Sequence, residues 1–233
     1  QISSKNHNIP VRVYSPEANF DCPLLLFFHG GGWVAGSIES YNKICTNMAR
    51  LTNHKVVSVD YRLAPENPFP AGLEDCYETA KAFIANDEIN DKEVTLIGDS
   101  AGGNLAAALS LLARDRKEFK VDKQILIYPS TYNDYTENSP FKSVIENGTD
   151  YLLTSKRIRD YMDLYKTKED DIYSPYFAPL LSRDFTKQPK TLIITAEYDP
   201  LRDEGEEYGR KLREAGNYVE IYRINDALHG FFA

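Results

Sequence analysis

The sequence predicts an α/β fold built on a mainly parallel, doubly wound sheet. Three observations support this prediction. Short runs of aliphatic and β-branched residues alternate with helical stretches along most of the chain. The run "KVVSVD" (55–60) is almost continuously apolar, which is typical of a strand buried on both faces. The chain has 233 residues, 42% of them hydrophobic, and is long enough for one domain with a sizeable core.

The expected elements follow in chain order from these patterns. We expect strands over "VRVY" (11–14), "LLLFF" (24–28), 55–60, "EVTLIG" (93–98), "QILIYP" (124–129), "TLIITAE" (191–197) and "YVEIYRI" (218–224). Helices are expected over about 40–51, 71–86, 104–115, 154–166 and 201–215.

Three of these helices carry additional signals in the sequence. In 71–86 apolar residues recur at helical spacing, with Pro70 near the first turn. The stretch 104–115 is apolar almost all round, which favours a buried helix. The helix at 201–215 ends just before Gly216, a residue type that commonly follows a helix C-terminus.

Residues 130–190 interrupt the alternation of strand and helix. This insertion of about sixty residues is rich in Tyr, Asp, Asn and Ser. A connection of that length is usually functional, and it leaves from the strand ends where open α/β sheets bind ligands. We therefore interpret it as a cap or lid; the alternative is a surface subdomain without a role in the site.

Composition excludes several classes of function. A net charge of −8 argues against nucleic acid or an anionic membrane as partner. The three cysteines (Cys22, Cys45 and Cys76) show no CxxC spacing, which excludes a cysteine-based zinc site and suits a reducing, cytoplasmic location. No apolar run is long enough to span a bilayer, and no metal site is expected.

The stretch "GDSAGGN" (98–104) places one serine between small residues at a predicted junction of strand and helix. A serine raised on such a tight turn needs small residues two positions before and after it, because these pack against neighbouring backbone. Gly98 and Gly102 occupy those positions. The pattern predicts Ser100 as a nucleophile; the alternative is an ordinary glycine-rich turn.

A nucleophilic serine needs a base, and the base needs an acid that orients it. His229 is the only histidine after Ser100, and it follows the last predicted strand. Four acids compete for the third position: Glu197, Asp199, Asp203 and Asp226. We prefer Asp199, because it lies in the loop just past a strand end on the predicted catalytic edge.

The run "HGGGW" (29–33) follows a predicted buried strand. Consecutive glycines let backbone N–H groups turn toward a ligand without interference from a Cβ atom. We expect Gly31, Gly32 and Ala101 to donate their N–H groups to an oxyanion. His29 is interpreted as a structural anchor rather than a second base.

Five stretches stand in a characteristic order: "HGGGWVAGS" (29–37), "VDYRLAPENPFPAGLEDC" (59–76), "GDSAGGNLA" (98–106), "AEYDPLRDEGEEY" (196–208) and "HGF" (229–231). Together they resemble the hormone-sensitive-lipase-like family of α/β-hydrolases, in its acetyl-esterase and carboxylesterase branch. The resemblance implies an α/β-hydrolase fold, ester hydrolysis without a cofactor, and Ser100, Asp199 and His229 as the triad. It also implies one domain over 1–233 that is shortened at both ends relative to the family.

The expected function is a serine carboxylesterase that hydrolyses short-acyl esters through an acyl-enzyme. An amidase or a deacetylase of acetylated sugars would use the same triad, and a non-catalytic small-molecule-binding module is the alternative of another class. We expect Trp33, Tyr132, Tyr151 and Phe177 to line the substrate pocket. The expected partners are a small-molecule ester and, at the edge formed by the last strand, a second copy of the chain.

Overall fold

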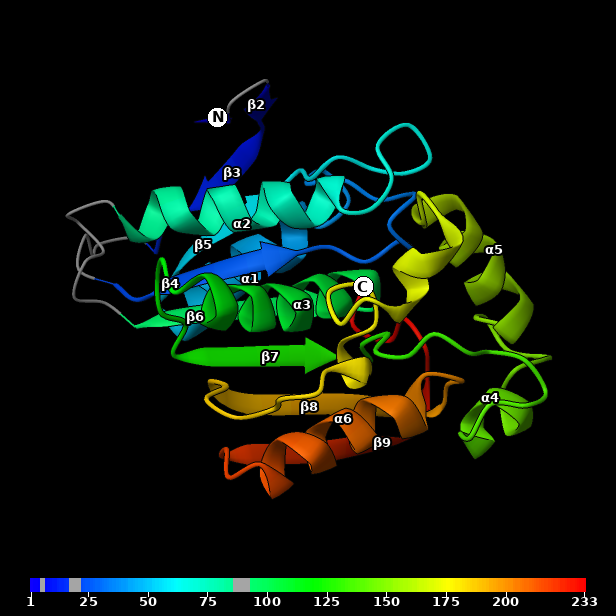
Figure 1. Ribbon diagram of the computed structural model, residues 1–233. Coiled ribbons are helices and arrows are strands. Elements are labelled where there is room, and N and C mark those ends of the chain that lie inside the picture. Colours follow the sequence, from blue (N-terminus) through cyan, green and yellow to red (C-terminus); the bar gives the residue numbers. More distant parts are fainter. Residues whose placement is uncertain (5–6, 17–21, 86–92) are drawn as a thin grey trace.

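The computed structural model describes residues 1–4, 7–16, 22–85 and 93–233, and a twisted seven-stranded sheet is its central layer (Figure 1). In spatial order the strands are β3 (Val11–Tyr14), β5 (Lys55–Val59), β4 (Leu24–Phe28), β6 (Val94–Asp99), β7 (Lys123–Ile127), β8 (Lys190–Tyr198) and β9 (Val219–Leu228). Only β3 runs antiparallel to its neighbour. The short strands β1 (Ile2–Ser3) and β2 (Asn8–Ile9) pair separately. The predicted fold class is confirmed.

Helices cover both faces of the sheet. The helices α2 (Ala71–Ile84), α3 (Ala101–Arg116) and α6 (Arg202–Glu214) lie on one face, and α1 (Asn42–Thr52) lies on the other (Figure 1). Alternation along β4 explains the two core clusters, because successive side chains point to opposite faces of a strand. Leu24, Leu26 and Phe28 join the larger cluster with α2 and α3, whereas Leu25 and Phe27 pack against α1.

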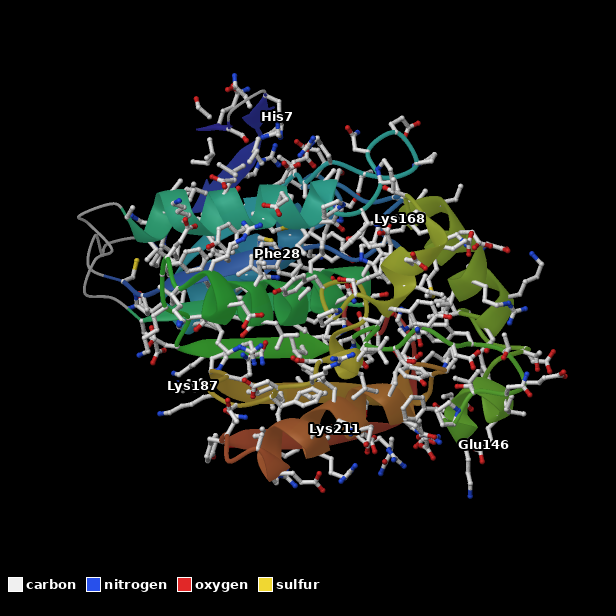
Figure 2. All side chains as sticks on the ribbon, viewed as in Figure 1. His7, Phe28, Glu146, Lys168, Lys187 and Lys211 are labelled. Atoms are coloured by element: carbon white, nitrogen blue, oxygen red, sulfur yellow. The ribbon has the colours of Figure 1, made fainter. Side chains whose placement is uncertain are left out.

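The insertion between β7 and β8 lies beyond the carboxyl ends of the parallel strands (Figure 1). It contains α5 (Ser155–Tyr165), close to the predicted helix at 154–166, and also α4 (Lys142–Glu146) and two 3₁₀ turns, η1 (Glu169–Tyr173) and η2 (Pro179–Leu181). These shorter elements were not predicted because none is long enough to show helical periodicity. In Figure 2, Glu146 and Lys168 lie at this end of the molecule and Lys187 at the opposite end of the sheet.

Several element ends differ from the prediction by one to four residues. Helix α2 ends at Ile84, and residue 86, the predicted end, lies outside the described residues. Strand β9 continues to Leu228, and its pairing with β8 shifts register between Ala196 and Tyr198. The extended strand carries the chain to His229 at the carboxyl edge of the sheet. No helix in the described part of the chain is both long and apolar enough to cross a membrane.

The turn between β6 and α3 packs directly on the end of β4. A Cβ atom added at Gly98 would lie 2.8 Å from the carbonyl oxygen of Phe28, and one added at Gly102 would lie 2.7 Å from that of His29. Real Cβ atoms essentially never approach backbone so closely. Glycine at these two positions therefore allows the strand and helix to meet.

We expect Gly102→Ala to destabilise the fold by about 3 kcal/mol, because the added methyl group must displace backbone. Gly205→Ala in α6 is the matched control, since its Cβ would meet neighbouring atoms at an ordinary 3.4 Å. That variant should gain about 0.5–1 kcal/mol from helix propensity. Urea unfolding of both variants measures the difference; equal stability of the two would contradict the packing argument.

Candidate active site

Ser100 occupies the turn between β6 and α3 in a strained backbone conformation. Its φ is 54° and its ψ is −118°, although positive φ is uncommon for residues other than glycine. The Ser100 N–H donates to the carbonyl oxygen of Ile127 at 2.9 Å, which ties the turn to β7. Such strain persists only where the surrounding structure enforces it, and it is characteristic of functional sites.

Ser100, His229 and Asp199 form one chain of hydrogen bonds. The Ser100 Oγ lies 2.9 Å from His229 Nε2, and His229 Nδ1 lies 2.7 Å from Asp199 Oδ2. An ionised carboxylate can only accept, so Nδ1 carries the proton of the neutral imidazole. This tautomer leaves Nε2 free to accept the Ser100 hydroxyl. The structure thus brings the three residues together in the order that the sequence predicted.

Buried contacts hold both partners of the serine in place. Asp199 is fully buried, and its second carboxylate oxygen accepts the N–H of Leu201 at 2.9 Å. The His229 ring packs against the ring of Tyr128, with 4.6 Å between centroids. The N–H of Phe232 donates to the Tyr128 hydroxyl, so Tyr128 holds both the His229 ring and the loop that follows it.

The other three candidate acids make different contacts. Glu197 accepts the N–H of Asp226, and Asp203 accepts the N–H of Ser143 and the side chain of Arg202. None of these carboxylates bonds to His229 in the described part of the chain. Asp199 alone has the geometry of an orienting acid among the four.

The loop after β4 presents unpaired backbone N–H groups beside Ser100. Gly31 and Gly32 have φ values of 123° and 62°, and the Gly31 carbonyl is occupied by the N–H groups of Val34 and Ala35. Within the described residues the N–H groups of Gly31 and Gly32 have no acceptor. Ala101 is the first residue of α3, where an N–H lacks an intrahelical partner and the helix dipole favours negative charge.

Asp99, next to Ser100, fixes the start of that glycine loop. Its carboxylate accepts the N–H of Gly30 at 2.9 Å and the hydroxyl of Tyr41 at 2.9 Å. Burial raises the pKa of Asp99 to about 6, against the opposing effect of these hydrogen bonds. His29 is also buried and stacks on Tyr61, and burial lowers its pKa, which keeps the ring neutral. It contacts no member of the hydrogen-bonded chain.

A cavity of about 310 Å³ opens over Ser100. The glycine loop, the Ser100 turn and His229 form its floor, and the insertion contributes Leu152, Leu153, Arg157, Ile158 and Tyr161. The sequence analysis did not identify these five residues. The i, i+4 spacing of Arg157 and Tyr161 indicates that they share one face of a helix, but it does not indicate that this face borders the cavity.

The structure corrects most of the predicted pocket lining. Trp33 does border the cavity, although its ring is buried and stacks on Tyr165. Tyr132, Tyr151 and Phe177 are not among the residues that line it. Their rings pack elsewhere: Tyr132 on Phe141, Tyr151 on Tyr198, and Phe177 in the core against Trp33 and Tyr165. The prediction rested on aromatic character alone, which does not determine direction.

A buried carboxyl group lies behind the site. One oxygen of Glu204 accepts the N–H groups of Thr131 and Tyr132 and the hydroxyl of Tyr135, at 2.6, 3.1 and 2.7 Å. These contacts tie the start of the insertion to α6. The other oxygen has no partner within the described residues. In the same part of the chain, no group of three or more His, Cys, Asp and Glu side chains could hold a metal ion.

Burial raises the pKa of Glu204 to about 8 from an ordinary 4.5. A carboxyl group with a raised native pKa stabilises the fold fully below its unfolded pKa and loses that contribution as pH rises through the native value. We therefore expect wild-type stability to fall by about 2–3 kcal/mol between pH 6 and 8 on account of Glu204. Glu204→Gln mimics the protonated acid and should flatten this part of the profile.

Melting temperatures of the two proteins between pH 5 and 9 provide the measurement. The groups that titrate elsewhere are common to both proteins, so only the difference in slope matters. For a chain of this size, a difference of about 2–3 kcal/mol in the free energy of unfolding corresponds to a difference of roughly 5–10 °C in melting temperature. Parallel pH profiles for wild type and Glu204→Gln would show that Glu204 is ionised throughout this range.

Comparison with known proteins gives a consistent result. A family model described as alpha/beta hydrolase fold matches residues 25–233. An arylesterase of Saccharolobus solfataricus is 38% identical over 99% of this chain and 75% of its own length. The carboxylic ester hydrolase LipN of Mycobacterium tuberculosis is 38% identical over 96% of this chain and 61% of its own length.

A solved structure agrees with these sequence relatives. The hyperthermophilic esterase of Pyrobaculum calidifontis superposes with a TM-score of 0.91 at 41% identity, covering 99% of this chain and 76% of that one. The chain thus spans between 61% and 76% of the length of these relatives. From the matched family model and the extent of these similarities, the chain belongs to the alpha/beta hydrolase fold family, in the esterase branch that resembles hormone-sensitive lipase.

Proposed function

We propose that the protein is a serine carboxylesterase that hydrolyses short-acyl esters through an acyl-enzyme intermediate. The observation that carries this proposal is the hydrogen-bonded chain from Ser100 Oγ through His229 to Asp199, at 2.9 and 2.7 Å. Its position beside unpaired N–H groups and below a cavity adds support. The names of the related esterases point to the same chemistry.

In the first half of the reaction Ser100 attacks the ester carbonyl. His229 Nε2 takes the hydroxyl proton as the Oγ–carbon bond forms. The carbonyl oxygen becomes an oxyanion that accepts hydrogen bonds from the N–H groups of Gly31, Gly32 and Ala101. When the tetrahedral intermediate collapses, the bond to the alcohol oxygen breaks and His229 returns the proton to the leaving alcohol.

In the second half water attacks the acyl-enzyme. His229 takes a proton from the water as it adds to the acyl carbonyl, and the same N–H groups hold the second oxyanion. Collapse breaks the bond to Ser100 Oγ, which recovers its proton from His229. Asp199 keeps the imidazole in the required tautomer and stabilises the imidazolium in both halves, because its buried carboxylate bonds to Nδ1–H.

Cavity size supports small substrates. A volume of about 310 Å³ lies at the lower end of the usual range for small-molecule sites. Three of the lining residues that the insertion contributes are aliphatic: Leu152, Leu153 and Ile158. We interpret residues 130–190 as a cap over the site within one domain spanning 1–233.

The remaining expectations stay proposals. We propose a cytoplasmic location, with which the three buried free cysteines agree. We also propose a homodimer across β9, which is the last strand of the sheet. Tyr222 and Ile224 on this strand are 54% and 41% exposed, so apolar surface is available there.

Ser100→Ala should lower turnover of p-nitrophenyl butyrate by at least about 10⁴-fold, because the nucleophile is removed while the fold is kept. Ser110→Ala is the matched control, since Ser110 lies on α3, the helix that follows Ser100, and bonds to Gln188 rather than to the site. Mass spectrometry of quenched wild type should detect an acyl group on Ser100. Ligand binding without turnover by wild type would instead favour a binding module, and hydrolysis of amides alone an amidase.

Among p-nitrophenyl esters we expect acyl chains of roughly two to six carbons to give the highest kcat/KM. Each added CH₂ contributes about 0.8 kcal/mol of burial until the cavity is filled, after which longer chains must remain in water. A series from acetate to palmitate at fixed detergent concentration measures the optimum. An optimum at twelve carbons or more would contradict the assignment of this cavity as the acyl site.

A further inference from the structure

Helix α5 lies directly against the glycine loop of the site. A Cβ atom added at Gly32 would lie 2.6 Å from Cγ of Tyr161, so the tyrosine ring packs on the backbone of the loop. Arg157 precedes Tyr161 by one helical turn and lines the same cavity, as does Ile158. One face of α5 therefore borders the space in which the substrate is expected to bind.

Arg157 differs from its charged neighbours on this helix. Lys156 pairs with Asp160 at 2.6 Å, and the Arg159 guanidinium donates to the carbonyl oxygen of Tyr135 at 2.5 Å. The Arg157 side chain makes no ion pair or hydrogen bond to any described residue; only its backbone N–H bonds, to the Thr154 cap. Arg157 is also exposed. A cation with all its donors available borders the cavity.

No acidic side chain among the described lining residues is free to neutralise that cation. Asp99 is the only acidic side chain among the described lining residues, and Gly30 and Tyr41 already bond to both of its oxygens. Much of the remaining wall is apolar, including Leu152, Leu153 and Leu201. The guanidinium fork matches a carboxylate bidentately and keeps its charge throughout the physiological pH range.

We propose that Arg157 determines specificity by binding a carboxylate on the substrate, so that the preferred substrates are small esters that carry a carboxylate a few bonds from the scissile ester. Half-esters of short dicarboxylic acids are the simplest members of this class. The proposal rests on the esterase function proposed above and adds the substrate class to it. Arg157 takes no part in the bond-making steps.

The test compares two esters of matched length, mono-ethyl succinate and ethyl butyrate, which differ by a carboxylate in place of a methyl group. Proton release in a pH-stat follows both. The readout is kcat/KM for mono-ethyl succinate divided by kcat/KM for ethyl butyrate. A uniform loss of activity in a variant does not affect this ratio. Arg157→Gln should lower this ratio about tenfold, mainly through KM for the half-ester, and Arg157→Glu should lower it further.

Lys156→Gln is the matched control, because it makes the same change of charge on the same helix at a residue outside the cavity lining. It should leave the ratio within about twofold of wild type, since exposed charges away from the site are screened. Raising NaCl from 50 to 500 mM should reduce the ratio in wild type and not in Arg157→Gln. An unchanged ratio in Arg157→Gln, or an equal change in Lys156→Gln, would overturn the proposal.

Separate outcomes distinguish a failure of the carboxylate-binding proposal from a failure of the proposed esterase function. If wild type hydrolyses ethyl butyrate and the ratio is insensitive to Arg157, the esterase function stands and the carboxylate site does not. If wild type hydrolyses neither ester, calorimetric titration with mono-ethyl succinate decides: a Kd about tenfold weaker in Arg157→Gln supports the carboxylate site, and equal Kd values reject it.

Discussion

The close approach of β6 and α3 to the end of β4 is the packing constraint on which the site depends. It requires glycine at Gly98 and Gly102, because a side chain at either would overlap backbone of Phe28 or His29. The same approach holds Ser100 at positive φ and places the N-terminus of α3 beside the loop that follows β4. One contact between backbones thus sets the positions of both Ser100, the proposed nucleophile, and the N–H groups that would face the oxyanion. Neither could be repositioned without moving the other.

Three buried carboxyl groups connect this turn to the rest of the molecule. Asp99 holds the glycine loop, Asp199 orients His229, and Glu204 ties the insertion to α6. Burying a carboxylate is costly unless hydrogen bonds replace the lost water. Each of the three accepts at least two such bonds, yet burial still raises the pKa of Asp99 and of Glu204. These groups therefore specify geometry, at some cost in stability at neutral pH.

What the sequence could predict was local. The glycines around Ser100 and the three consecutive glycines before Trp33 indicate close packing of the backbone near them. The turn at Ser100 and the loop after β4 could therefore be predicted from short patterns, as could the order of strands and helices. Cavity lining depends on how the insertion packs across the sheet, which no local pattern encodes. Phe177 was expected at the pocket and joined the core, because its ring fits between Trp33 and Tyr165. Arg157 was overlooked for the same reason: it lines the cavity only because α5 crosses the glycine loop.

The insertion and the segment around Asp199 are held by the same hydrogen bonds. Asn147 donates to the carbonyl oxygen of Asp199, and the Ser143 hydroxyl donates to that of Pro200. Glu204, four residues after Pro200, accepts the N–H of Thr131 and so holds the chain shortly after it leaves β7. The segment that supplies Arg157 to the cavity is therefore fastened to the turn that carries Asp199. A displacement of the insertion large enough to change the cavity would strain these bonds and move the carboxylate that orients His229. The proposed substrate recognition by Arg157 and the alignment of Ser100, His229 and Asp199 would therefore be mechanically coupled, because both depend on the same few hydrogen bonds beyond the end of β8.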